Sequence, residues 1–364
     1  MVRMAAPNTY LQKYMCVRKL CIFLCVSLLL LVVRQSAAQS LIFSQYYFSP
    51  PNINPSLASL EKDLFLGINH RSQWRDLTVP YNATLFSMIC PVFTTKPSLR
   101  HLGGFGIAVS KESAGIGTLY QLYRGHFSAA YNLPLDFESS NLLAMGIQGG
   151  FVQKSLNEMA LQWGSQYNPV IGFDPTLVPS LGGLHSRIIY PTFSAGITWY
   201  HVKTGYQTEK KPKSFIGFSL ANINRPDYSL FDHYSTRAPL IYSFQGGVTY
   251  RAQKKLNIMH TLLAIGARKT YHVNFGTYVI YSLTSPYNID RVSLNLLVGS
   301  WYRLGDAFVL STGLQARNIN IALSYDFNSG NTLDNTVRGG AYEVSLSYRI
   351  VQKKTRRRYA IPLI

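Results

Sequence analysis

The sequence predicts an all-β fold, a transmembrane antiparallel β-barrel of about 14 strands that follows a cleaved signal peptide. Three observations predict it. Apolar and polar residues alternate strictly near the carboxyl terminus, the first residues have the layout of a signal peptide, and the composition is poor in charge and rich in aromatic residues.

Two segments near the carboxyl terminus alternate with almost no error. One side of each is apolar, with Ile319, Ile321, Leu323, Tyr325 and Phe327 in the first and Tyr342, Val344, Leu346, Tyr348 and Ile350 in the second. The residues between them are polar or small. A period of two indicates a strand with two unlike faces, and a tilted strand of about nine to eleven residues crosses a bilayer.

Residues 1–38 are predicted to be a signal peptide. Basic residues precede an apolar run from Leu20 to Val33, and the small residues Ser36 to Ala38 then offer a cleavage site. The run has fourteen residues, which is short for a membrane anchor. Cleavage near Gln39 leaves Cys90 as the only cysteine, which excludes a disulfide framework and a cysteine metal site.

The composition excludes other classes of protein. Charged residues make up 14% of the chain, against about 25% in soluble proteins, and aromatic residues make up 13%, as suits a barrel with aromatic girdles. Without the signal peptide, 30 Lys and Arg stand against 16 Asp and Glu, a formal charge of +14. Secretion argues against nucleic acid as the partner of this charge. Anionic lipopolysaccharide, or acidic surfaces of envelope proteins, are the expected partners.

Alternation and turn residues together predict fourteen strands. An even number places both ends of the barrel in the periplasm, so connections after odd strands face outward and should be longer. They include the three longest, 154–189, 225–240 and 328–340. The barrel is thus predicted to occupy 63–351, with a tail at 352–364. The strands begin near Leu64, Asn82, Gly103, Tyr120, Asn141, Tyr190, Lys213, Ile241, Met259, His272, Arg291, Ala307, Asn318 and Ala341.

A soluble secreted β-sandwich is the alternative fold, because its strands also alternate. Its outward positions would carry Lys, Glu and Thr, whereas the uniform faces here are apolar, as at Val292, Leu294 and Leu296. The barrel is therefore favoured.

The opposite faces predict the lining of the lumen. They carry small hydrogen-bonding residues and a few charges, including Asp326, Glu343 and Arg349, which suit a wet or a plugged interior. Residues 39–62, rich in Ser, Asn, Pro and aromatic residues, are either a plug or a periplasmic leader that packs against the barrel mouth.

The sequence does not indicate an enzyme. No histidine stands at a metal-ligand spacing such as His-x-Glu or His-x-x-x-His, and no cofactor is expected. A lipase site in the barrel wall could use His70 with Ser72, or His201 with Ser194, but no oxyanion device is found beside either pair.

Short motifs add what periodicity does not. Taken in order, they resemble the PorP/SprF family of type IX secretion system outer-membrane proteins of the Bacteroidota, over essentially the whole mature chain. The motifs are Phe43-Ser44-Gln45-Tyr46, Asn54-Pro55-Ser56, Arg71-Ser72-Gln73-Trp74, Phe215-Ile216-Gly217-Phe218-Ser219-Leu220-Ala221-Asn222, Asn274-Phe275-Gly276-Thr277-Tyr278, Ser324-Tyr325-Asp326-Phe327 and Gly339-Gly340-Ala341-Tyr342-Glu343-Val344-Ser345-Leu346.

The resemblance implies a non-enzymatic subunit of the secretion and gliding machinery. Its partners would be periplasmic ring lipoproteins and a secreted cargo or adhesin with a C-terminal sorting domain. Two alternatives stay open. One is a porin-like or hydrophobic-solute transporter, which the polar lumen face favours. The other is an adhesive barrel that uses outer loops such as the one with Trp163, Tyr167 and Phe173.

Candidate contact residues follow from the motifs and the alternation. Arg71 is expected to pair with Asp326 or Glu343 if the first and last strands close the barrel, because interior charges are usually paired. The basic tail is expected in the periplasm, either solvated or docked to a partner; it consists of Lys353, Lys354, Arg356, Arg357 and Arg358. Contacts with a plug or a ring are expected at the periplasmic entry or the first strand, at Gln45, Asn54, Pro55, Arg71, Gln73 and Trp74.

Overall fold

A computed structural model describes residues 42–74, 80–93, 101–115, 118–136, 140–177, 183–202, 213–268, 270–284, 293–328 and 340–351. The predicted signal peptide at 1–38 and the basic tail at 352–364 lie outside these residues.

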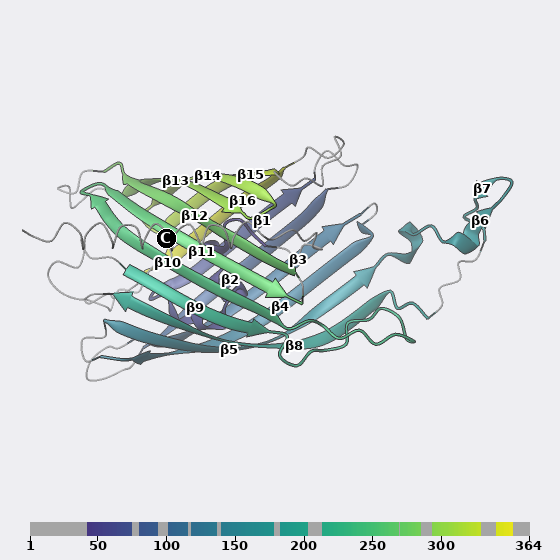
Figure 1. Ribbon diagram of the computed structural model, residues 1–364, viewed down its shortest axis with the longest axis horizontal. Coiled ribbons are helices and arrows are strands. Elements are labelled where there is room, and N and C mark those ends of the chain that lie inside the picture. The colour runs from purple at the N-terminus through teal and green to yellow at the C-terminus, as the bar shows by residue number, and fades with distance from the viewer. Residues whose placement is uncertain are drawn as a thin grey trace, which may run out of the picture. The chain divides into compact units, whose positions relative to one another are not determined.

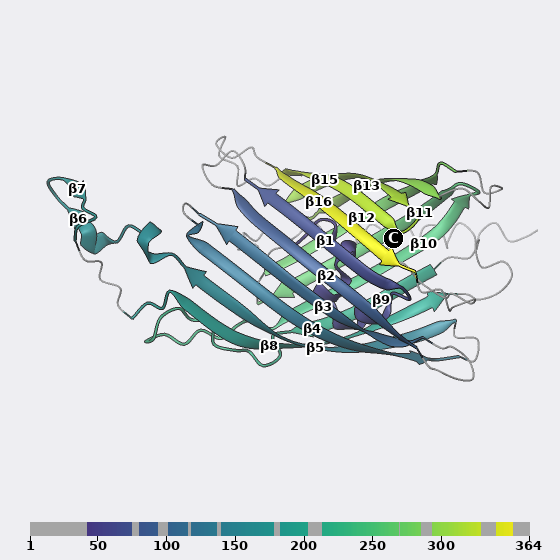
Figure 2. The ribbon, with the colours of Figure 1, turned by 180° about the vertical axis from the view of Figure 1, so that it is seen from behind.

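Within the described residues, fourteen antiparallel strands form a closed barrel, in the order β1-β16-β15-β14-β13-β12-β11-β10-β9-β8-β5-β4-β3-β2 (Figures 1 and 2). Its strands are β1 (Leu64–Gln73), β2 (Tyr81–Phe93), β3 (His101–Ala114), β4 (Tyr120–Pro134), β5 (Asn141–Leu156), β8 (Arg187–Val202), β9 (Lys213–Ala221), β10 (Ile241–Gln253), β11 (Leu256–Ala267), β12 (Thr270–Ser282), β13 (Leu294–Arg303), β14 (Ala307–Ala316), β15 (Ile319–Asn328) and β16 (Ala341–Ile350).

The closed barrel confirms the fold class predicted from alternation. Each barrel strand begins within three residues of its predicted start. The longest connections between barrel strands are 157–186, 222–240 and 329–340, and all three follow odd-numbered strands in the predicted count. The first of them contains the 3-10 turns η5 (Glu158–Ala160) and η6 (Gly164–Gln166) and a small hairpin of β6 (Tyr167–Asn168) and β7 (Gly172–Phe173).

The first and last strands close the barrel. β1 pairs with β16 along its whole length, from Leu64 opposite Ile350 to Gln73 opposite Ala341. Exposed and buried residues alternate strictly along β16, with Tyr342, Val344 and Leu346 exposed. A closed sheet has no unpaired edge, and its outer face here is predominantly apolar.

Residues 42–61, called the N-terminal segment below, lie inside the ring of strands (Figures 1 and 2). The segment contains three 3-10 turns, η1 (Tyr46–Phe48), η2 (Pro50–Asn52) and η3 (Pro55–Ser59). Such turns are short because their hydrogen bonds are poorly aligned, so contacts with the surrounding wall must hold them in place.

Among the described residues, no helix has the length and apolarity needed to cross a membrane.

Candidate functional site: the anchored N-terminal segment

Hydrogen bonds fix the N-terminal segment to strands on all sides of the barrel. Main-chain carbonyls of the segment accept several of them, as when Gln148 Nε2 donates to Pro51 O at 3.0 Å and Ser219 Oγ donates to Ile53 O at 2.8 Å. The strands that contribute polar contacts are β1, β2, β4, β5, β8, β9, β10, β13, β15 and β16. The polar side chains of the lumen face therefore supply hydrogen bonds to a segment whose main chain forms few regular ones of its own.

The strongest anchor lies at Ser44 and Gln45. Two consecutive main-chain amides donate to the carboxylate of Glu343 on β16, from Ser44 N at 2.8 Å and Gln45 N at 2.9 Å. The Ser44 hydroxyl donates to Asp326 Oδ1 on β15 at 2.8 Å. Hydrogen bonds to an ionised group are about twice as strong as neutral ones, so this end of the segment is held firmly.

Two arginines complete the cluster. Arg71 on β1 lies 2.7 Å from Asp326 and 3.4 Å from Glu343, and Arg303 on β13 lies 2.9 Å from Asp326. Both guanidinium groups also donate to the Ser44 hydroxyl oxygen, at 2.8 and 2.7 Å. All of these side chains are buried, so each charge depends on its partners in place of water.

The Asn54-Pro55-Ser56 motif has a structural explanation. Asn54 caps η3, because its Oδ1 accepts from Ser56 N at 2.9 Å, and Pro55 occupies the first position, where no amide hydrogen is needed. The Asn54 Nδ2 group donates to Ile197 O and Phe218 O, each at 3.2 Å. One buried asparagine therefore caps the start of the turn and joins it to β8 and β9.

Aromatic packing supports the middle of the segment. Tyr47 lies 5.5 Å from Tyr278 and 5.8 Å from Trp301, measured between ring centroids. Tyr278 and Trp301 are edge-on to each other at 4.8 Å. Such pairs contribute about 0.5–1.5 kcal/mol beyond the area they bury. The lumen face of β11 to β13 is thus more apolar than the small, hydrogen-bonding lining that the sequence predicted.

The end of the segment that leads into β1 has its own ion pair. Arg349 Nη2 on β16 lies 3.0 Å from Glu61 Oε1, and the guanidinium lies over the ring of Phe65. The neighbouring Lys62 is buried. Burial lowers the pKa of Lys62 to about 7, with a further lowering by Lys213, while Asp63 opposes the shift.

The structure brings Gln45, Arg71 and Gln73 together inside the barrel. Arg71 and Gln73 lie in the second half of β1 and Trp74 follows it, at the end opposite to the one where the chain enters that strand. Gln45 lies beside Arg71 because the segment extends back through the lumen. Asn54 and Pro55 lie elsewhere in the lumen, against β8 and β9. Gln45 therefore lies in the lumen near the second half of β1, and the contact of these residues with a secretion ring stays a prediction.

Sequence reasoning missed Ser44 and Arg303. Ser44 belongs to the Phe43-Ser44-Gln45-Tyr46 motif, but a serine outside any periodic segment does not indicate a buried charge cluster. Arg303 ends a strand whose inward residues, Leu297 and Trp301, are apolar. Because Arg303 is an even number of positions from Leu297 and Trp301, alternation alone would have placed its side chain on the same inward face.

A cavity of about 220 Å³ remains between the segment and the wall. Phe43 and Ile53 line it from the segment, and Arg124, His126 and Thr192 line it from β4 and β8. Arg124 is paired with Glu112 on β3. The segment therefore fills the lumen incompletely on this side.

The histidines considered for a lipase site have other neighbours. His70 Nδ1 is 2.9 Å from Thr84 Oγ1, and His201 Nδ1 is 2.9 Å from Asn141 Oδ1. Within the described ranges, no group of three or more His, Cys, Asp or Glu residues could hold a metal ion. The Val292 side chain and the basic tail lie outside those ranges.

Comparisons with solved structures return other barrels. The toluene transporter TbuX of Ralstonia pickettii is 10% identical, with a TM-score of 0.43 over 82% of this chain and 92% of that one. The CymD monoaromatic hydrocarbon channel is 10% identical, with a TM-score of 0.41 over 87% and 95%. A Pseudomonas aeruginosa FadL homologue is 11% identical, with a TM-score of 0.37 over 81% and 92%. No curated protein matches the chain.

The family comparison covers nearly the whole chain. A model described as type IX secretion system membrane protein PorP/SprF matches residues 35–348. Together with the closed barrel and its apolar outer wall, the match assigns the protein to the outer membrane. The chain belongs to the PorP/SprF family of type IX secretion system membrane proteins.

Proposed function

We propose that the protein is a non-enzymatic subunit that assists export of cargo with C-terminal sorting domains and docks to periplasmic ring components of the secretion and gliding machinery. Membership of the family carries this proposal. The N-terminal segment inside the lumen supports it, because Gln45, Asn54 and Ser56 are fully buried and held from several strands. A barrel filled in this way is better suited to holding partners than to conducting solutes.

Deletion of the gene tests the export role. We expect cargo with C-terminal sorting domains to accumulate in the periplasm of the deletion strain and to reach the surface again when the full chain is restored. Normal export of every such cargo in the deletion strain would contradict the proposal.

The docking role needs a separate measurement. The tagged protein is purified from detergent-solubilised outer membranes, and the co-purifying proteins are identified by mass spectrometry. We expect ring lipoproteins or a large adhesin, and lipopolysaccharide among the bound lipids.

A second version of the protein, with Lys353, Lys354, Arg356, Arg357 and Arg358 changed to Ser, tests the tail. Exposed charge steers association more than it adds affinity, so we expect slower and salt-sensitive recovery of ring proteins. Equal recovery from both versions at low and high salt would exclude the tail as the docking element.

A further inference from the structure

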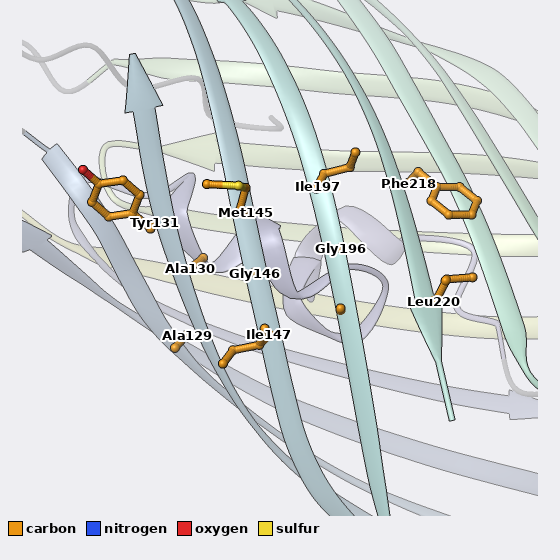
Figure 3. A pocket seen from close by; sticks show the side chains of 11 residues that line it. Ala129, Ala130, Tyr131, Met145, Gly146, Ile147, Gly196, Ile197, Phe218 and Leu220 are labelled. Carbon is orange, nitrogen blue, oxygen red and sulfur yellow. The ribbon is translucent and has the colours of Figure 1, made fainter. Parts of the chain in front are cut away.

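The outer wall of the barrel has a hollow of about 610 Å³ across β4, β5, β8 and β9 (Figure 3). Two rows of outward side chains meet there in register. Ala129, Ile147 and Ala195 are opposite one another in one row, and Tyr131, Met145 and Ile197 in the next. Ala129 and Ala195 are shorter than their neighbours, so the wall is recessed at these two positions, on either side of the exposed Ile147.

The wall behind the hollow is thin. Gly146 and Gly196 point inward, and a Cβ on either would collide with Asn54 or with the main chain of Pro55 and Ser56. The N-terminal segment therefore lies directly against the inner side of the recessed wall. Figure 3 shows its turns behind the strands that carry the labelled residues.

The segment also fixes the shape of the hollow. Asn54 Nδ2 bridges the carbonyls of Ile197 and Phe218, two residues whose side chains line the outer side. Strands tied together from inside keep their spacing when the outer side is empty. A preformed site avoids the ordering cost that a flexible one incurs on binding.

The chemistry of the lining identifies the occupant. The lining side chains are apolar except for the Tyr131 hydroxyl. Outward residues on both sides along the strands are also large and apolar, Phe127 and Phe193 on one side and Leu133 and Ile216 on the other. In an outer-membrane protein this position lies in the hydrocarbon band, where lipid chains are the adjoining molecules.

The hollow is much larger than a single water molecule needs. It exceeds by about twentyfold the ~30 Å³ that a water molecule occupies. Within a bilayer the hydrophobic effect does not drive association, and van der Waals packing decides. Side chains that left this space empty would lose contacts that a methylene chain restores.

We propose that this hollow is a binding site for one acyl chain of an outer-membrane lipid. The chain lies over Ala195, between Ile147 on β5 and Leu220 on β9. The site goes beyond the secretion role and does not depend on it.

Photocrosslinking tests the site. The full chain is reconstituted in phosphatidylethanolamine vesicles with a trace of the same lipid carrying a diazirine in one acyl chain, irradiated, and digested for mass spectrometry. We expect lipid adducts concentrated on Tyr131, Met145 and Phe218. Adducts spread evenly around the barrel, in proportion to exposure, would overturn the proposal.

Filling the hollow provides the decisive variant. Ala195→Phe places a ring in the space from outside and leaves the inner face unchanged, so adducts on Met145 and Phe218 should fall severalfold. Thr312→Phe, at an exposed outward position on β14, is the matched control and should leave them unchanged. Both variants are first checked for a folded barrel by heat-modifiable mobility.

Two further outcomes are informative. Unchanged adducts in Ala195→Phe would overturn the proposal. Crosslinking in cells through a photoreactive residue at position 145 should recover lipid, and recovery of a polypeptide there would replace the lipid by a protein partner.

Discussion

The hydroxyl of Ser44 lies where three strands converge on the N-terminal segment. It donates to Asp326 and accepts from Arg71 and Arg303, at distances of 2.7–2.9 Å. Two arginines and two carboxylates buried together are stable only as a set, because removing one member leaves another without its partner. Breaking a buried ion pair in this way costs about 3–5 kcal/mol.

Glu343→Ala should therefore destabilise the barrel strongly. The change removes the acceptor of two main-chain amides and one counter-charge of Arg71. We expect the free energy of unfolding, measured by urea titration in detergent, to fall by about 3–5 kcal/mol. Asp232→Ala, which removes an exposed partner of His185, is the control and should have little effect. Equal urea midpoints for Glu343→Ala and the unchanged protein would contradict the anchoring role of Glu343.

Lys62 should make stability depend on pH. Burial lowers its pKa to about 7 from the ordinary 10.5. Between these values the unfolded chain binds more protons than the folded one, so stability rises with pH. The contribution is complete above about pH 10.5 and is lost as the pH falls through about 7.

Lys62→Met should accordingly flatten the difference in urea midpoint between pH 7 and pH 10. Lys254→Met, at an exposed position on the turn between β10 and β11, should preserve it. The same pH dependence in both variants would show that another group causes it.

The sequence predicted some members of this cluster and not others. Asp326 and Glu343 stand on inward faces of segments that alternate strictly, and closure of first strand on last brings Arg71 to them. Ser44 lies in a non-periodic segment, so its position depends on packing across the lumen. Arg303 was hidden because its strand has a largely apolar inward face.

At the scale of elements, strands were predictable and the N-terminal segment was not. Strand starts depend on alternation and turn residues, which are local signals. The turns η1 to η3 depend on contacts with strands far along the chain, such as Asn54 with Ile197 and Phe218. The sequence left plug and periplasmic leader equally open because no local pattern distinguishes them.

Two glycines of β5 test how closely the wall fits the segment. A Cβ at Gly146 would collide with the main chain of Pro55 and Ser56, whereas a Cβ at Gly149 would meet only the Phe193 ring at 3.7 Å, an ordinary contact. Gly146→Ala should lower the free energy of unfolding by about 1–3 kcal/mol, as overpacking does. Gly149→Ala is the control on the same strand. Similar effects at both positions would mean that the loss of glycine itself matters.

At the scale of the molecule, we predict that the N-terminal segment blocks conduction through the lumen. We expect the full chain to give little ion conductance in planar bilayers, because the segment is tied to most of the strands. A version without residues 44–59 should conduct. Removing the hairpin at 167–173 is the control and should leave the barrel closed.

The two outcomes separate secretion subunit from transporter. High conductance by the full chain, with no increase on removal of the segment, would favour the porin-like alternative. Circular dichroism and heat-modifiable mobility establish that each version is folded before the currents are compared.

The distance along the chain between Ser44 and its partners has a consequence for assembly. Ser44 precedes Asp326 by 282 residues and Glu343 by 299. The segment is synthesised first, but its binding site is complete only when β16 has been placed beside β1. Docking of the segment must therefore be a late step of barrel insertion. Any factor that inserts the strands has to hold the segment undocked until β16 pairs with β1.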